Sequence, residues 1–251
     1  ALAARINGLL VSPRFTAWRQ GAPLDPQRLF WSEDGTPRLS IYSVAHLLPE
    51  ERAFAVAQLL DRVVTWLRTQ SGATTVRAVL LIDEIFGYFP PAPANPPTKT
   101  PLLTLLKQAR AFGVSVVLAT QNPIDLDYRG LANIGTWLVG RLQSQQDKAR
   151  IRDALISAAA ATDTTPAQLD DLLSTLEPRR YLLHSVHRRK PTVFTTRDAL
   201  CHLRGPFSPD ELKRLNAEVS TDGVAPAAPA PTVATDDVVI DPALGPVWEV
   251  D

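Results

Sequence analysis

Two short apolar runs, each followed at once by polar side chains, constrain the fold of this chain more than any other feature. The runs are Ala78–Ile82 (AVLLI) and Val114–Ala119 (VSVVLA). A continuous apolar run of this length is typical of a strand buried on both faces of a parallel sheet. The segment between them, Thr100–Phe112, has the spacing of a helix that ends before Gly113. This alternation of strand, helix and strand predicts an α/β fold with a mostly parallel sheet flanked by helices.

Further elements are predicted on both sides of this unit. A helix from Pro49 to about Thr69 is expected, because apolar side chains recur there at helical spacing and a proline with two acids begins it. Other predicted strands are Pro37–Val44, Thr136–Leu142 and a hairpin of Arg180–Val186 with Pro191–Thr196. Other predicted helices are Ala1–Gln20, Gln145–Ile156, Pro166–Leu176 and a short helix capped by Ser208.

These elements divide the chain into four parts. An N-terminal helix and connecting loop occupy residues 1–35, a core occupies 36–205, a terminal helix occupies 206–216, and a Pro- and Ala-rich acidic linker or tail occupies 217–251. The net charge of zero hides an asymmetry, because the seven acids after Asn216 have no Lys or Arg among them. Residues 1–216 therefore hold 26 basic and 19 acidic residues, a charge of +7 that suggests an anionic partner.

Composition also narrows the class of protein. No apolar run approaches the roughly 20 residues that cross a bilayer. The single cysteine, Cys201, excludes an intrachain disulfide framework and fits a reducing compartment, which indicates the cytoplasm. The chain begins with Ala1 and contains no methionine, which indicates a piece of a longer product.

The polar residues that follow the two apolar runs form the candidate site. Asp83 and Glu84 follow the first run, and Gln121 and Asn122 come soon after the second. Because the carboxyl ends of parallel strands meet at one edge of a sheet, these side chains are expected to lie together. A carboxylate there can hold Mg²⁺ through water, a second one can deprotonate an attacking water, and an amide can sense a terminal phosphate. The alternative is a pair of carboxylates on a solvated turn.

A nucleotide-hydrolysing enzyme also needs a phosphate-binding loop, G-x-x-x-x-G-K-[ST]. None of the twelve glycines is followed by lysine. The segment from Gly130 to Gly135 has the glycine spacing, but Thr136 and Trp137 follow it and it precedes a predicted strand. The loop therefore lies upstream of Ala1 or is absent.

The ordered set of motifs resembles the C-terminal half of the ATPase core in the HerA/FtsK superfamily. It looks more closely like bacterial ATP-binding proteins with a HerA-type helicase or translocase core, over roughly residues 36–205. The segments that carry the resemblance are Leu80–Pro90 (LLIDEIFGYFP), Pro101–Gly113 (PLLTLLKQARAFG), Leu118–Pro123 (LATQNP), Asn133–Thr136 (NIGT) and Gly140–Arg141.

The resemblance implies a RecA-like fold of the P-loop NTPase type, truncated before the Walker A strand. It also implies Mg²⁺-dependent ATP hydrolysis, assembly into a homo-oligomeric ring, commonly a hexamer, and movement on DNA. Asp83 falls on the Walker B aspartate, which holds Mg²⁺ through water, and Glu84 falls on the catalytic glutamate. Gln121 falls on the polar sensor, with Asn122 beside it as a nucleotide contact.

Three basic residues match positions that reach the phosphates of a neighbouring subunit in such rings. They are Lys107, Arg110 and Arg141. Many relatives carry an arginine where this chain has Trp137, and this departure makes Arg141 the better candidate for a trans-acting arginine. For Lys107 and Arg110 an ordinary solvated face of a helix remains the alternative reading.

Two other functions remain open from the sequence. One is a non-catalytic assembly or scaffold module without ATP binding, which the absent phosphate-binding loop favours. The other is an ATPase of the protein-secretion type. Five cations between Arg179 and Lys190 either contact a phosphate backbone or form a solvated hairpin tip. The aromatic residues Phe86, Tyr88 and Phe89 either stack on a base or pack the proline-rich loop.

Overall fold

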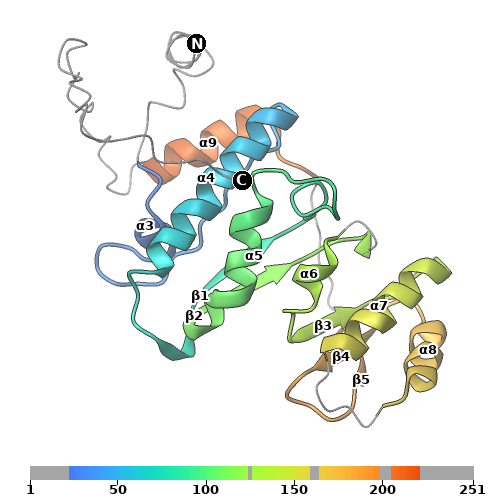
Figure 1. Ribbon diagram of the computed structural model, residues 1–251. Coiled ribbons are helices and arrows are strands. Elements are labelled where there is room, and N and C mark those ends of the chain that lie inside the picture. The colour runs from blue at the N-terminus through green and yellow to red at the C-terminus, as the bar shows by residue number, and fades with distance from the viewer. Residues whose placement is uncertain (1–22, 124–125, 159–163, 198–204, 221–251) are drawn as a thin grey trace. The chain divides into compact units, whose positions relative to one another are not determined.

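The computed structural model describes residues 23–123, 126–158, 164–197 and 205–220 (Figure 1). Residues 24–205 form one compact unit, and helix α9 (Pro209–Ser220) belongs to a second. The predicted cap of α9 is present, since Ser208 Oγ accepts from the Glu211 N–H at 3.4 Å. The helix predicted over residues 1–20 and the tail after residue 220 lie outside the described residues. No helix in the described ranges is both long and apolar enough to cross a membrane.

A parallel pair of strands organises the first part of the larger unit. The pair is β1 (Ala73–Ile82) and β2 (Phe112–Leu118), with Ile82 opposite Leu118. They are connected through α5 (Lys99–Gln108) and a 3₁₀ turn, η2 (Ala109–Ala111), and are preceded by α3 (Pro26–Phe30) and α4 (Pro49–Leu67). The predicted α/β class, with a parallel strand pair and flanking helices, is confirmed.

Helices α4 and α5 cover one face of this sheet (Figure 1). Leu60 of α4 and Leu102 and Leu105 of α5 are fully buried in the core that Ala78 and Val114 of the two strands join. The side chains on the opposite face alternate with these, as a strand requires. Among the described residues this second face remains exposed, at 54% for Val79, 62% for Leu81 and 42% for Val117. The prediction that both faces are buried is therefore wrong for this part of the chain.

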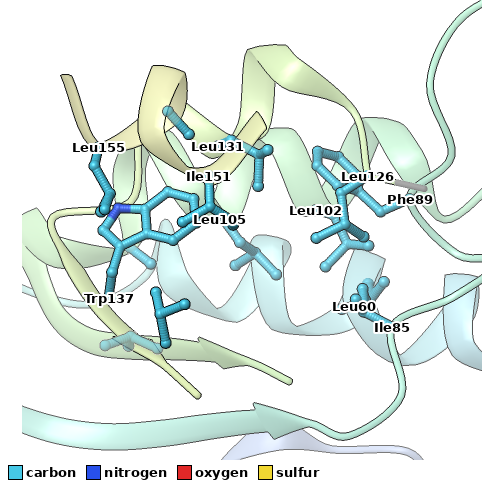
Figure 2. Packing of buried hydrophobic residues seen from close by; sticks show 14 of the residues in the cluster. Leu60, Ile85, Phe89, Leu102, Leu105, Leu126, Leu131, Trp137, Ile151 and Leu155 are labelled. Carbon is cyan, nitrogen blue, oxygen red and sulfur yellow. The ribbon is translucent and has the colours of Figure 1, made fainter. Parts of the chain in front are cut away.

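A second, antiparallel sheet follows in the same unit. Its order is β3–β4–β5, formed by β3 (Thr136–Val139), β4 (Arg180–Ser185) and β5 (Thr192–Thr195). The predicted hairpin is confirmed, whereas β3 pairs with β4 and not with the parallel strands. Three helices accompany this sheet, namely α6 (Tyr128–Leu131), α7 (Gln145–Ala158) and α8 (Pro166–Thr175). Figure 2 shows Trp137 of β3 with Ile151 and Leu155 of α7 in the buried cluster.

The segment Pro37–Val44, predicted as a strand, is not one. Its only strand-like feature is an isolated bridge between Pro37 and Trp31. Leu39 is 89% exposed and Ile41 is 87% exposed. Alternating apolar residues form a strand only when another strand supplies hydrogen-bond partners, and the described residues place none beside this segment.

A buried ion pair connects the proline-rich loop with the start of α6. Lys99 Nζ lies 2.7 Å from Asp127 Oδ2, and their side chains are only 2% and 4% exposed. Lys99 Nζ also donates to the Ala94 carbonyl oxygen at 2.9 Å, and the Asp127 N–H donates to the Phe89 carbonyl oxygen at 2.9 Å. The pair therefore fixes the loop that follows the candidate site against the rest of the core.

Candidate functional site

The turn after β1 is bound to the end of β2 by backbone hydrogen bonds. The Ala119 N–H donates to the Ile82 carbonyl oxygen at 2.9 Å, and the Ile85 N–H donates to the Ala119 carbonyl oxygen at 3.0 Å. The Ile85 side chain is completely buried in the core (Figure 2). The two residues between these anchors, Asp83 and Glu84, are therefore held at the carboxyl edge of the sheet with their side chains exposed.

The structure brings Asp83, Glu84 and Gln121 together at this edge. Gln121 Nε2 donates to Glu84 Oε1, a contact between residues that lie 37 positions apart in sequence. The Glu84 N–H donates to Asp83 Oδ1 at 3.1 Å. The amide of Gln121 thus orients one carboxylate, while Asp83 Oδ2 takes part in neither of these two hydrogen bonds.

These side chains line one pocket of about 720 Å³. This volume lies within the range of roughly 300–1,000 Å³ that is usual for small-ligand sites. Besides the two carboxylates, the lining includes Gln121, Asn122, Arg52, Phe86, Tyr88 and the segment from Ser43 to Ala45. The pocket therefore combines oxygen ligands, amide donors, one cation and two aromatic rings.

The donor chemistry of the pocket fits a hard divalent cation. Mg²⁺ prefers oxygen ligands, keeps several waters, and is usually held by one or two carboxylates together with substrate phosphates. Asp83 and Glu84 supply such carboxylates on an open edge. Within the described ranges no cluster of three or more His, Cys, Asp or Glu residues forms a metal site made by protein alone. A cation here would accordingly share its ligands with water and an anionic substrate.

Glu84 has a backbone conformation that is unfavourable for any residue with a side chain. Its φ is +50°, in the left-handed region, where the Cβ atom of a non-glycine residue costs roughly 1–2 kcal/mol. The anchors at Ile82 and Ile85 impose this conformation on the turn. Strain of this kind is found at functional sites, where it aims a side chain that would otherwise point elsewhere.

This strain predicts a difference in folding stability between two variants that both remove the carboxylate. Glu84→Gly is expected to be more stable than Glu84→Ala by about 1 kcal/mol, because only glycine relieves the left-handed strain, and part of that gain is offset by its larger unfolded-state entropy. Urea unfolding of both variants measures the difference. Equal stability would show that the turn does not hold residue 84 at positive φ.

The three predicted basic residues lie outside this pocket. Arg110 is in η2, next to Phe112, which pairs with Ala73 at the opposite end of the sheet from Asp83. The strand from Phe112 to Leu118 rises about 20 Å, so neither Arg110 nor the nearby Lys107 reaches the carboxylates of its own chain. Arg141 follows β3 and does not line the pocket. All three side chains are exposed, and their action on a neighbouring subunit stays a prediction.

The glycine-spaced segment at Gly130 has a packing role. A Cβ atom at Gly130 would come within 2.2 Å of the Phe89 ring, which is completely buried. Gly130 lies inside α6, and Trp137, which follows the segment, is buried with its Nε1 donating to the Ile134 carbonyl oxygen at 3.0 Å. Close packing explains these residues without any phosphate, in agreement with the sequence analysis.

The aromatic residues after Glu84 divide between packing and the pocket. Phe89 belongs to the core (Figure 2), and burial raises the pKa of the half-buried Tyr88 above its usual value. Phe86 lines the pocket and remains 61% exposed. Of the three, Phe86 presents the most open ring to a ligand.

Sequence reasoning missed Arg52, the pocket's only cation among the described residues that line it. Arg52 lies in the first turn of α4, next to Glu50 and Glu51. Acidic residues are favoured at this end of a helix, and a cation there is opposed by the helix dipole. This mismatch is the one signal in the sequence that could have singled it out.

Solved structures similar to this chain include those of viral NTPases. A genome-packaging NTPase, B204 of Sulfolobus turreted icosahedral virus 2, in complex with ATP-gammaS is 18% identical, with a TM-score of 0.41 over 56% of this chain and 62% of that one. The same protein with sulfate is 16% identical, with a TM-score of 0.46 over 70% and 73%. B204, the DNA-packaging ATPase from Sulfolobus turreted icosahedral virus, is 16% identical, with a TM-score of 0.46 over 71% and 74%.

No family model matches the chain, and no curated protein matches it. The chain spans less than two thirds of the length of the first of these viral structures. Because the TM-scores lie below 0.5, what this chain binds and does is inferred from its own pocket.

Proposed function

We propose that the pocket at Asp83 is one half of a Mg²⁺-ATP hydrolysis site in a ring-shaped motor of the HerA/FtsK type. The observation that carries this proposal is the meeting of Asp83, Glu84 and Gln121 in one pocket beyond two parallel strands. Ligands of open parallel sheets bind at this edge. Two exposed carboxylates, one of which accepts a hydrogen bond from a side-chain amide, are an arrangement that suits a metal-bound phosphate and an attacking water.

Each residue has a separate task in this proposal. Asp83 binds the metal ion through water, and the metal, when bound, offsets charge on the phosphate oxygens. Glu84 accepts the proton of the attacking water, and its strained backbone with the Gln121 hydrogen bond fixes the direction of its carboxylate. Gln121 and Asn122 donate to the terminal phosphate.

In this proposal, the remaining parts of the site lie beyond one copy of these 251 residues. Their sequence contains no glycine-rich loop followed by lysine, so the phosphate-binding loop has to be supplied by other polypeptide. The exposed Arg141, and with it Lys107 and Arg110, are proposed to reach the phosphates of a neighbouring subunit in a ring, commonly a hexamer.

DNA is the cargo that the charge distribution favours, which makes the motor a translocase or helicase. Residues 1–216 carry a net charge of +7, and the turn between β4 and β5 exposes Arg188 and Lys190. Basic side chains on an exposed hairpin turn can follow a phosphate backbone without reading its sequence.

The test measures ATP turnover by the assembly that contains this chain, with and without duplex DNA, at low and moderate salt. The proposal predicts stimulation by DNA that weakens as salt rises and that falls when Arg188 and Lys190 are both replaced by Gln. Turnover that responds to a protein cargo but not to DNA would favour a secretion-type ATPase. An assembly that never hydrolyses ATP would favour the scaffold function.

A further inference from the structure

Arg52 has a guanidinium whose hydrogen-bonding capacity is not satisfied by the described protein. Its Nη2 donates to the Leu47 carbonyl oxygen at 3.2 Å and, at 3.5 Å, to that of Ala45. Its Nε is buried and has no hydrogen-bond partner among the described residues. A buried donor without an acceptor is costly, and such a group in a native protein calls for a physical explanation.

No carboxylate of the described chain forms an ion pair with Arg52. The neighbouring Glu51 is occupied as a helix cap, since the Leu48 N–H donates to its Oε2 at 3.1 Å. Glu84 shares the pocket with Arg52, but its carboxylate accepts from Gln121 instead. The guanidinium therefore lies beside a pocket that contains two carboxylates, and it pairs with neither of them.

The charge of the pocket explains this arrangement once a metal ion is considered. Asp83 and Glu84 contribute two negative charges and Arg52 one positive charge to the lining. A divalent cation bound by the carboxylates changes the net charge of the pocket from negative to positive, and the pocket then attracts an anion. The guanidinium offers that anion planar donors in a fixed fork, a geometry that matches phosphate oxygens.

We propose that Arg52 donates to the phosphate chain of the nucleotide and so supplies, from the start of α4, part of the phosphate binding that a glycine-rich loop provides elsewhere. This inference rests on the proposed function of the pocket. It goes beyond that function by adding a cationic phosphate contact on the chain's own side of the site, distinct from the trans-acting residues. The hydrogen bond from Arg52 to the Leu47 carbonyl oxygen holds the guanidinium beside the pocket before the nucleotide arrives.

The experiment compares the whole chain with Arg52→Met, Arg52→Lys and the control Arg62→Met, an exposed arginine on the same helix. The probes are Mn²⁺ alone, Mn²⁺-ATP and Mn²⁺ with inorganic tripolyphosphate, and binding is followed by water-proton relaxation. Arg52→Met is expected to weaken binding of both phosphate probes by at least about tenfold, because a charge-assisted hydrogen bond is lost. Binding of Mn²⁺ alone is expected to change less than about twofold. Arg52→Lys is expected to recover part of the lost binding of the phosphate probes, because it keeps the positive charge.

Added salt separates a phosphate contact from a structural role. The difference between wild type and Arg52→Met shrinks with added KCl if the arginine contacts phosphate charge, and it stays constant if the arginine only holds the loop at Ala45 and Leu47. A constant difference, or Mn²⁺-ATP binding by Arg52→Met within twofold of wild type, would overturn the inference and leave the proposed function intact. Failure of the assembly that contains this chain to bind Mn²⁺-ATP at all would instead refute the proposed function, and the inference with it.

Discussion

Glu84→Gln is expected to lower ATP turnover by about 10²- to 10⁴-fold in the assembly that contains this chain, the range that a general base contributes. The substitution keeps the shape of the side chain, and the amide oxygen can still accept from Gln121. It removes only the capacity to accept a proton from the attacking water. Nucleotide binding is therefore expected to persist, so that the loss appears in kcat and not in KM.

The matched control is Glu177→Gln. Glu177 is an exposed carboxylate that pairs with Arg180 at 3.1 Å and does not line the pocket. Its replacement is expected to leave turnover within twofold of wild type, because an exposed ion pair of this kind contributes little. Steady-state phosphate release measures both variants. Normal turnover in Glu84→Gln would show that another group activates the water.

Asp127→Ala is expected to destabilise the fold by about 3–5 kcal/mol, since it leaves the Lys99 ammonium buried without its counterion. Asp127 also accepts from the Arg129 N–H at 2.8 Å at the start of α6, so the variant loses a backbone contact as well. Urea unfolding measures the loss. The matched control is Asp170→Asn, which breaks the partly exposed pair with Arg152 and is expected to cost less than about 1 kcal/mol. An equal loss of unfolding free energy in the two variants would contradict the claim that the buried ion pair matters more than the partly exposed one.

Ionisation of the Asp127 carboxylate is expected to make the stability of the fold depend on pH. Hydrogen bonds from Arg129, and then the bond and charge of Lys99, hold the pKa of Asp127 well below its usual range, although burial alone would raise it. Because the folded-state pKa is lower than the unfolded one, this stabilisation is fully present above about pH 4 and is lost as the pH falls below that value. The unfolding free energy of Asp127→Ala is expected to fall less steeply with acid than that of wild type.

Local patterns predicted most of the helices and the edge of the sheet where the site lies. The apolar spacing of α4, the proline that begins α8 and the two short runs of the β4–β5 hairpin are properties of short segments, and the structure confirms these elements. The proximity of Glu84 and Gln121 followed from the ends of two parallel strands, which does not depend on the rest of the fold.

Features that depend on contacts between segments far apart in the sequence could not be predicted from local patterns. The exposure of Val79 and Leu81 depends on which elements cover each sheet face, and an apolar run looks the same whether one face or both are covered. The segment Pro37–Val44 has a strand pattern, but the described chain offers it no neighbouring strand. Arg52 reaches the pocket only through the packing of α4, which sequence spacing does not encode.

The most direct test of the central claim is a paramagnetic map of Mn²⁺-ATP bound to the 251-residue chain. Mn²⁺ broadens the NMR signals of nearby nuclei even when binding is weak, so the measurement does not require a complete phosphate-binding loop. The account predicts selective broadening of the Gln121 side-chain amide and of the Asp83 and Glu84 backbone amides, and its loss in Asp83→Asn. Broadening elsewhere on the chain, or none at these three residues, would contradict the assignment of this pocket to a metal–nucleotide complex.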